Sequence, residues 1–224
     1  MHNLSITEFI LRNRQEYFNQ IRDNFKIEDK IQALSFSSVV FLGIYGIVLG
    51  AGDSALQAIV SMIKLPILFL VTLLICAPSL HIFYILLGAR QTIMQTTALL
   101  LTTVGTTSLL LLGFAPITFF FLITGDNYYF YKILNVSILG ISGFLGAYFL
   151  HQGIKIVINP HAEENPKRRN LFLIIWVLLY GFVGAQMAWT LDPFIGNPEI
   201  PFVLFSNEGG NFFVDIIKSL GEIF

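Results

Sequence analysis

Five long apolar runs constrain this chain more than any other feature of its sequence. They cover residues 34–52, 65–87, 96–124, 131–153 and 170–191, and each is nearly free of charge. A helix of about 20 apolar residues crosses the hydrocarbon core of a bilayer, which is roughly 30 Å thick. Only 12% of the residues are charged, against about 25% in a typical soluble domain. The sequence therefore predicts an all-α fold, a polytopic transmembrane helical bundle of about five spans within residues 33–191.

The third run is longer than the others and contains a proline. At about 1.5 Å per residue, a helix over 96–124 exceeds the thickness of a bilayer. Pro116 lies inside it, and a proline within a helix removes a backbone donor and kinks the helix. We expect one long span, kinked or tilted. The alternative is a separate reentrant element over 117–124, although non-helical backbone at that depth needs shelter from lipid.

Two polar segments with helical periodicity flank the spans. Residues 1–32 contain a capping-box pattern, in which Ser5 and Glu8 would satisfy free backbone donors at a helix start. This segment carries five basic and five acidic residues, so it is not a polybasic lipid binder. We expect an amphipathic cytoplasmic helix that lies on the inner membrane surface or packs under the bundle. The tail, 192–224, begins with a proline-rich linker and is expected to end in a second amphipathic helix over 211–224.

The lysine and arginine residues predict the orientation of the chain. With five spans, the N-terminal segment shares one side with the loops after spans two and four. Cytoplasmic loops carry an excess of positive residues, so we expect a cytoplasmic N-terminus and an outside C-terminus, in a bacterial inner (plasma) membrane. The first side carries ten positive residues, Arg12, Arg14, Arg22, Lys26, Lys30, Arg90, Lys155, Lys167, Arg168 and Arg169, and the other side carries three, Lys64, Lys132 and Lys218.

Small residues recur at helical spacing in three of the spans. Such faces let helix backbones approach closely, and close packing is what joins helices in lipid. We expect these residues to pack helices within the chain, and a homodimer or partner-helix face is the alternative. The candidate helix-packing residues are Gly43, Gly46 and Gly50 in the first span, Gly140, Gly143 and Gly146 in the fourth, and Gly181 and Ala185 in the fifth.

A few polar residues in or beside the spans are candidates for a polar site. An ionisable residue inside a membrane is costly and often functional, but we expect His81 to be neutral and bonded to backbone or to Ser79. Thr103 belongs to a threonine-rich stretch, 96–108, whose hydroxyls are expected to bond back to helix carbonyls rather than to line a pore. No carboxylate falls in mid-membrane, which argues against a proton- or cation-coupled transporter. The candidates are His81, Thr103, Gln186 and Asp192.

The motifs that mark common enzyme chemistries are missing. The sequence has no phosphate-binding glycine loop, zinc-ligand spacing, nucleophile elbow or dinucleotide fingerprint. The sequence Gly-Ile-Ser-Gly at 140–143 looks like the serine motif of rhomboid proteases, but that chemistry needs a histidine base within reach of the serine. Neither His81 nor His151 has the required placement. We therefore expect no enzyme activity, catalytic residue, cofactor or metal site, and the net charge of −1 without a basic cluster argues against nucleic acid.

The layout of the chain is similar to that of a known family. A short loop, 88–91, leads into the small and polar helix 96–108, and the fourth run, 131–153, ends in a His-Gln-Gly-Ile-Lys sequence at 151–155. With a cytosolic N-terminal segment and five closely spaced spans over 34–191, the chain resembles Yip-family membrane proteins and their uncharacterised bacterial relatives. The resemblance implies a membrane scaffold, assembly or trafficking-type protein that acts through protein or lipid contacts.

Other functions remain as alternatives to the scaffold. One is a channel or transporter for a small or uncharged solute, and another is an intramembrane enzyme. The block Gly-Phe-Val-Gly-Ala-Gln-Met-Ala-Trp at 181–189, followed by 192–196, is similar to a block in uncharacterised bacterial membrane proteins but implies no activity. The partners that we expect are the lipid bilayer, other membrane proteins or further copies of the chain in a homo-oligomer.

Overall fold

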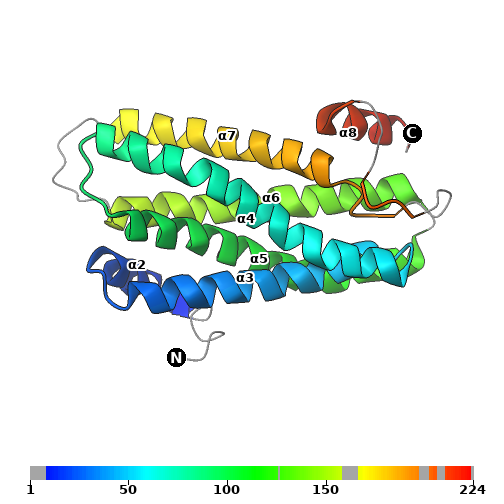
Figure 1. The fold of residues 1–224 in the computed structure, drawn as a ribbon, viewed down its shortest axis with the longest axis horizontal. Helices are drawn as coiled ribbons and strands as arrows, with labels where there is room; N and C mark the ends of the chain where they lie inside the picture. The colour runs from blue at the N-terminus through cyan, green and yellow to red at the C-terminus, as the bar shows by residue number, and fades with distance from the viewer. Residues whose placement is uncertain (1–8, 126, 158–165, 197–201, 206–209, 223–224) are drawn as a thin grey trace. The chain divides into compact units, whose positions relative to one another are not determined.

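A computed structural model describes residues 9–125, 127–157, 166–196, 202–205 and 210–222 of the chain. Every regular element in these residues is an α-helix, as Figure 1 shows. The helices are α2 (Arg14–Arg22), α3 (Ile27–Gly50), α4 (Ala55–Leu86), α5 (Ile93–Thr124), α6 (Tyr128–Val157), α7 (Pro166–Leu191) and α8 (Phe212–Gly221). Five of them, α3 to α7, are long and apolar enough to cross a membrane. The predicted all-α membrane fold is confirmed.

The long helices extend beyond the apolar runs that predict them. The clearest case is α4, which begins at Ala55 although its apolar run begins at 65. A helix satisfies its own backbone groups whatever its side chains, so hydropathy marks the part that crosses the hydrocarbon and not where the helix ends. The third span, α5, is one helix that continues through Pro116 to Thr124, so residues 117–124 extend it and form no separate reentrant element.

The N-terminal helix packs against the chain's own spans. Helix α2 buries Tyr17, Phe18 and Ile21, and the Tyr17 hydroxyl lies 2.8 Å from the Thr102 hydroxyl of α5. The Gln95 side chain of α5 donates hydrogen bonds of 3.3 and 2.8 Å to the last carbonyls of α2, which lack partners within the helix. The predicted amphipathic segment is thus a docked helix. The capping-box residues of its predicted start lie outside the described residues.

The chain divides into two compact units, and each takes one end of every long helix. Unit 1 comprises Met1–Ser38, Leu73–Leu109 and Gly143–Tyr180. It therefore contains α2, the N-terminal ends of α3, α5 and α7, and the C-terminal ends of α4 and α6. Unit 2 comprises Val39–Thr72, Leu110–Ser142 and Gly181–Phe224, and contains the opposite ends with α8. Consecutive long helices thus run in opposite directions within each unit, as a chain that crosses a membrane repeatedly requires.

Unit 2 has a buried polar cluster at its centre. The Tyr45 hydroxyl donates to Asn135 Oδ1 over 2.8 Å and lies 3.3 Å from the Thr118 hydroxyl. The Asn135 amide in turn donates to the Tyr131 carbonyl over 2.8 Å, and the Tyr131 hydroxyl donates to the Val48 carbonyl over 3.1 Å. These bonds join α3, α5 and α6 without leaving polar atoms facing lipid, which is the condition for burying them in a membrane.

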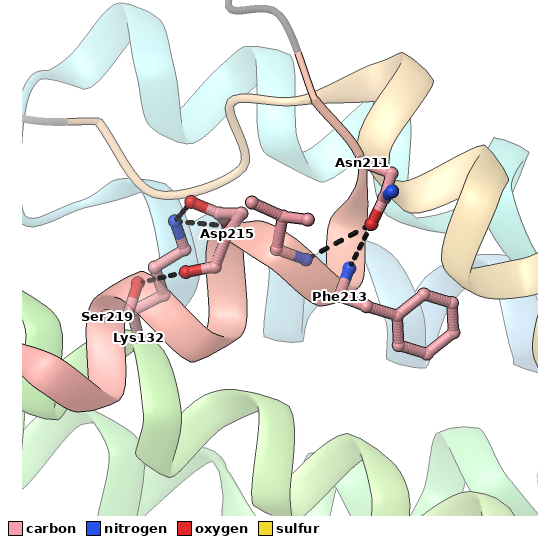
Figure 2. A network of polar contacts seen from close by, with 6 residues as sticks. Lys132, Asn211, Phe213, Asp215 and Ser219 are labelled. Atoms are coloured by element: carbon pink, nitrogen blue, oxygen red, sulfur yellow. Dashed lines mark hydrogen bonds and ion pairs between the residues drawn. The ribbon is translucent and has the colours of Figure 1, made fainter.

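Helix α8 has its polar side turned inward, as Figure 2 shows. Asn211 caps its start by accepting bonds from the amides of Phe213 and Val214, a favoured use of asparagine. Asp215 forms an ion pair with Lys132 of α6, with 2.6 Å between the charged atoms, and both side chains are largely buried. The apolar side chains Phe213, Val214, Ile217 and Leu220 are exposed. This polarity is the reverse of a surface helix in water and suits a helix that faces lipid.

Candidate functional site

The candidate helix-packing glycines differ in what lies opposite them. A Cβ atom built on Gly46 would overlap the Ser61 carbonyl oxygen of α4, and one on Gly50 would lie 2.7 Å from the carbonyl carbon of Gln57. On α6, a Cβ on Gly146 would overlap the Thr107 hydroxyl of α5. At Gly46 and Gly50 the helix backbones are close enough that only glycine fits, whereas at Gly146 the overlap is with a side chain and the nearest backbone atom, the Thr103 carbonyl oxygen, lies at 3.0 Å. Such contacts are the expected use of small residues in membrane helices.

Three other glycines of the set face open space. A Cβ on Gly140, Gly143 or Gly181 would meet nothing within 4 Å, and one on Gly43 would make only ordinary contacts with Met62, at 3.4 Å from its side chain and 3.6 Å from its carbonyl oxygen. Ala185 is half-buried. Any close-packing partner of Gly140, Gly143 and Gly181 therefore lies outside the described residues.

His81 has a specific partner in unit 1. Its Nδ1 atom lies 3.0 Å from the hydroxyl of Thr96 on α5, and Thr96 also bonds back to the Thr92 carbonyl. Ser79, one of the two partners expected from the sequence, instead donates to the Cys76 carbonyl over 2.7 Å and accepts a bond from the indole of Trp176. His81 thus ties α4 to α5, and among the described residues no carboxylate accompanies it in a proton relay.

The threonine-rich stretch of α5 uses its hydroxyls within the helix. The hydroxyls of Thr102, Thr103 and Thr106 each donate to the carbonyl four residues earlier, at 2.7 to 3.1 Å. Ser108 donates to the Gly105 carbonyl over 2.8 Å. Thr102, Thr106 and Ser108 are also buried. These hydroxyls are satisfied without water, as an ordinary packed helix requires.

The last two polar candidates lie in unit 2, where they have different surroundings. Gln186 is half-buried in α7, and no hydrogen bond of its side chain is found among the described residues. Asp192 lies just beyond α7 and is close enough to Lys64 of α4 for the two charges to interact. The four candidates do not gather in either unit, because His81 and Thr103 lie in unit 1 and Gln186 and Asp192 lie in unit 2.

A polar face on α4 holds the chain that follows α7, and the sequence analysis did not identify it. Gln57 Nε2 donates to the Pro193 carbonyl over 2.8 Å, and the Ser61 hydroxyl donates to the Phe194 carbonyl over 2.6 Å. The Lys64 ammonium donates to the carbonyls of Pro193 and Leu204. It also lies 6.0 and 4.9 Å from the ring centres of Phe194 and Phe205, within the range of cation–π attraction.

The spacing of that face was visible in the sequence. Gln57, Ser61 and Lys64 recur at intervals of four and three residues, which places them on one side of a helix. They precede the apolar run at 65–87, so hydropathy alone does not mark them as part of a packed helix. The face is structural, because each side chain donates to backbone carbonyls that would otherwise lack partners.

Neither a metal site nor a known relative identifies this chain. Among the described residues, no three His, Cys, Asp or Glu side chains come together in a way that could hold a metal ion. No family model matches the chain, and no curated protein or solved structure matches it. The class that the fold defines is therefore an all-helical membrane protein with five candidate spans.

Proposed function

We propose that this chain is a non-catalytic membrane scaffold, which acts by binding other membrane proteins or lipid through the outward faces of its spans. The observation that carries the proposal is the contrast between its glycines. Gly46 and Gly50 of α3 and Gly146 of α6 make close contacts inside the chain. Gly140 and Gly143, which also lie on α6, have nothing opposite them. Small residues exposed on a span allow another helix to approach closely.

The exposure of α7 supports the same proposal. In its most apolar stretch only 11% of the residues are buried within the chain, against 61% for α3. Gly181 of α7 also faces open space. A span with so little packing inside its own chain has most of its surface available to lipid or to another helix.

The polar groups of the spans favour a scaffold over a channel. The hydroxyls of Thr102, Thr103 and Thr106 are bonded back to their own helix, α5. Tyr45 and Asn135 bond to each other. A water-filled path needs polar side chains that face water. The resemblance to Yip-family proteins also implies a scaffold or trafficking role.

The distribution of charge supports the proposed orientation. All ten basic residues assigned to the cytoplasmic side fall in the ranges of unit 1, whereas Lys64, Lys132 and Lys218 fall in those of unit 2. Cytoplasmic ends of membrane proteins carry this excess. We propose that unit 1 lies at the cytoplasmic side of a bacterial inner membrane and that the C-terminus lies outside.

The proposal is tested by the size of the particle purified from native membranes. The wild-type chain, tagged at the N-terminus and extracted in mild detergent, is compared with Gly143→Leu and with the control Ile141→Leu, at a residue that is 53% exposed on the same helix. We expect a stoichiometric second component, a protein or another copy, that Gly143→Leu loses and Ile141→Leu keeps.

A lone chain in all three preparations would overturn the proposal of a protein-binding scaffold. The same preparations are then reconstituted in liposomes and tested for the flux of a small uncharged solute such as glycerol. Flux above that of empty liposomes would identify a channel or transporter, the alternative function.

A further inference from the structure

Basic side chains of unit 1 converge where α4 ends and α7 begins. Arg169 lies in the first turn of α7 and is half-buried. Its charge is close enough to act on the Tyr84 phenol near the end of α4 and on the His151 ring of α6. Lys155, one turn after His151 on α6, acts on the same ring. Arg169 thus links the Tyr84 phenol of α4 with the basic pair His151 and Lys155 of α6.

Two buried polar atoms at this place have no partner. The hydroxyl of Tyr84, a residue only 1% exposed, and the Nε atom of Arg169 are both buried without a hydrogen bond. Among the described residues no carboxylate bonds to Arg169. Leaving a buried polar group unsatisfied costs about 1–3 kcal/mol, and more for a charged one. Both atoms can donate, so the missing partner is an acceptor with negative charge.

The neighbouring polar groups are satisfied, which makes the exception informative. The indole of Trp176 on α7 donates to the Cys76 carbonyl over 3.2 Å and to the Ser79 hydroxyl over 3.0 Å. Both acceptors lie on α4, one to two turns before Tyr84. Phe172 packs edge to face against the Tyr84 ring, with 6.4 Å between ring centres. The Tyr84 hydroxyl and the Arg169 Nε atom are donors left without an acceptor, and the Gln91 side-chain oxygen after α4 is an acceptor left without a donor.

We propose that Tyr84 and Arg169, with His151 and Lys155 around them, bind the phosphate of an anionic phospholipid headgroup. A phosphate offers several acceptor oxygens, and the planar arginine donors suit it. The positive N-terminal end of α7 adds to the attraction. Basic pockets between membrane helices are known to hold anionic headgroups, and the exposed Phe83 and Leu171 place lipid beside the site. This site is independent of the proposed scaffold function.

The experiment measures thermal stabilisation of the purified full chain in nanodiscs. The lipid is phosphatidylcholine alone, or phosphatidylcholine with increasing phosphatidylglycerol at fixed ionic strength. The variants are Tyr84→Phe and Arg169→Gln. Arg168→Gln is the matched control, because it removes the same charge from the residue just before Arg169, whose side chain is exposed.

We expect phosphatidylglycerol to raise the melting temperature of the wild-type chain. The phosphatidylglycerol concentration that gives half of this rise should be at least about tenfold higher in Arg169→Gln and Tyr84→Phe, since each loses a bond to a charged group. It should change less than about threefold in Arg168→Gln. In dodecyl maltoside, a detergent without phosphate, Tyr84→Phe should melt no lower than wild type, because the Tyr84 hydroxyl has no partner within the protein.

Three results would overturn the site. One is an equal response of wild type to both lipids, and another is an equal loss in Arg168→Gln and Arg169→Gln. The third is a Tyr84→Phe chain that is already destabilised in dodecyl maltoside, which would show a partner within the protein. Inorganic phosphate that stabilises the chain as well as phosphatidylglycerol does would overturn the assignment to a lipid.

Discussion

Replacement of Gly46 by alanine should destabilise the chain, whereas the same change at Gly143 should not. The added Cβ at Gly46 would overlap the Ser61 carbonyl oxygen and lie 3.0 Å from the Met62 Cα atom. Both are backbone atoms, which cannot move aside as a side chain can. Overpacking costs about 1–3 kcal/mol, and we expect the upper part of that range because α3 and α4 must separate.

The helix propensity of alanine sets the size of the control. Exchange of glycine for alanine stabilises a helix by about 0.4–1 kcal/mol where the new methyl fits. At Gly46 this gain offsets part of the clash and leaves a net loss of about 2 kcal/mol. At Gly143 the methyl meets nothing within 4 Å, so the gain remains. The two substitutions should therefore change stability in opposite directions.

The assay is thermal unfolding of each purified variant in the same detergent. For a chain of this size about 1 kcal/mol corresponds to a shift of about 2–4 °C. We expect Gly46→Ala to melt about 4–8 °C below wild type and Gly143→Ala to melt at the same temperature or slightly above it. Equal shifts in the same direction would refute the close approach of α3 and α4 at Gly46.

Three further predictions concern the two short helices. Burial raises the pKa of Tyr17 above its ordinary value of about 10. The neutral phenol therefore stabilises α2 fully below about pH 10, and this contribution is lost at higher pH. The melting temperature should fall more steeply above about pH 10 in wild type than in Tyr17→Phe, and parallel curves would contradict this. Asp215→Asn should weaken the docking of α8 by about 1.5–3 kcal/mol and make the helix more sensitive to protease. Exchange of the charges between Lys132 and Asp215 should restore protection, and a double variant that stays sensitive would contradict the role of the ion pair. Asn211→Ala removes the cap of α8 and should destabilise this helix by about 0.5–2 kcal/mol. Faster protease cleavage of the tail measures the loss, and an unchanged cleavage rate would contradict it.

The spans could be predicted from sequence because their signal is local. A run of apolar residues needs no knowledge of the rest of the chain to be recognised as a span. The back-bonded hydroxyls of α5 are local in the same way, because Thr102 and Thr106 find their acceptors one turn earlier in the same helix. These features were correctly expected from residue types and spacing alone.

Contacts that depend on distant parts of the chain could not be predicted. Lys64 is buried because the carbonyls of Pro193 and Leu204 meet it, and these residues lie more than a hundred positions later. The same limit applies to the glycines. Gly46 and Gly143 look alike in sequence, but a backbone faces the first and nothing faces the second. What lies opposite a small residue decides whether it packs, and sequence spacing does not reveal it.

Most of the buried polar groups described in the spans have hydrogen-bond partners within the protein, as lipid surroundings require. The groups without such partners are of two kinds. The hydroxyls of Ser38 and Thr72 and the side-chain oxygen of Gln91 are buried without a partner, and each belongs to a neutral group. Tyr84 and Arg169 are unmatched together, among further basic groups and at the end of the spans. A membrane supplies no counter-charge in its hydrocarbon core but supplies many phosphates at its surface. An electropositive gap at that level is stable in the membrane when a headgroup fills it, and the same gap in mid-membrane would have no such remedy.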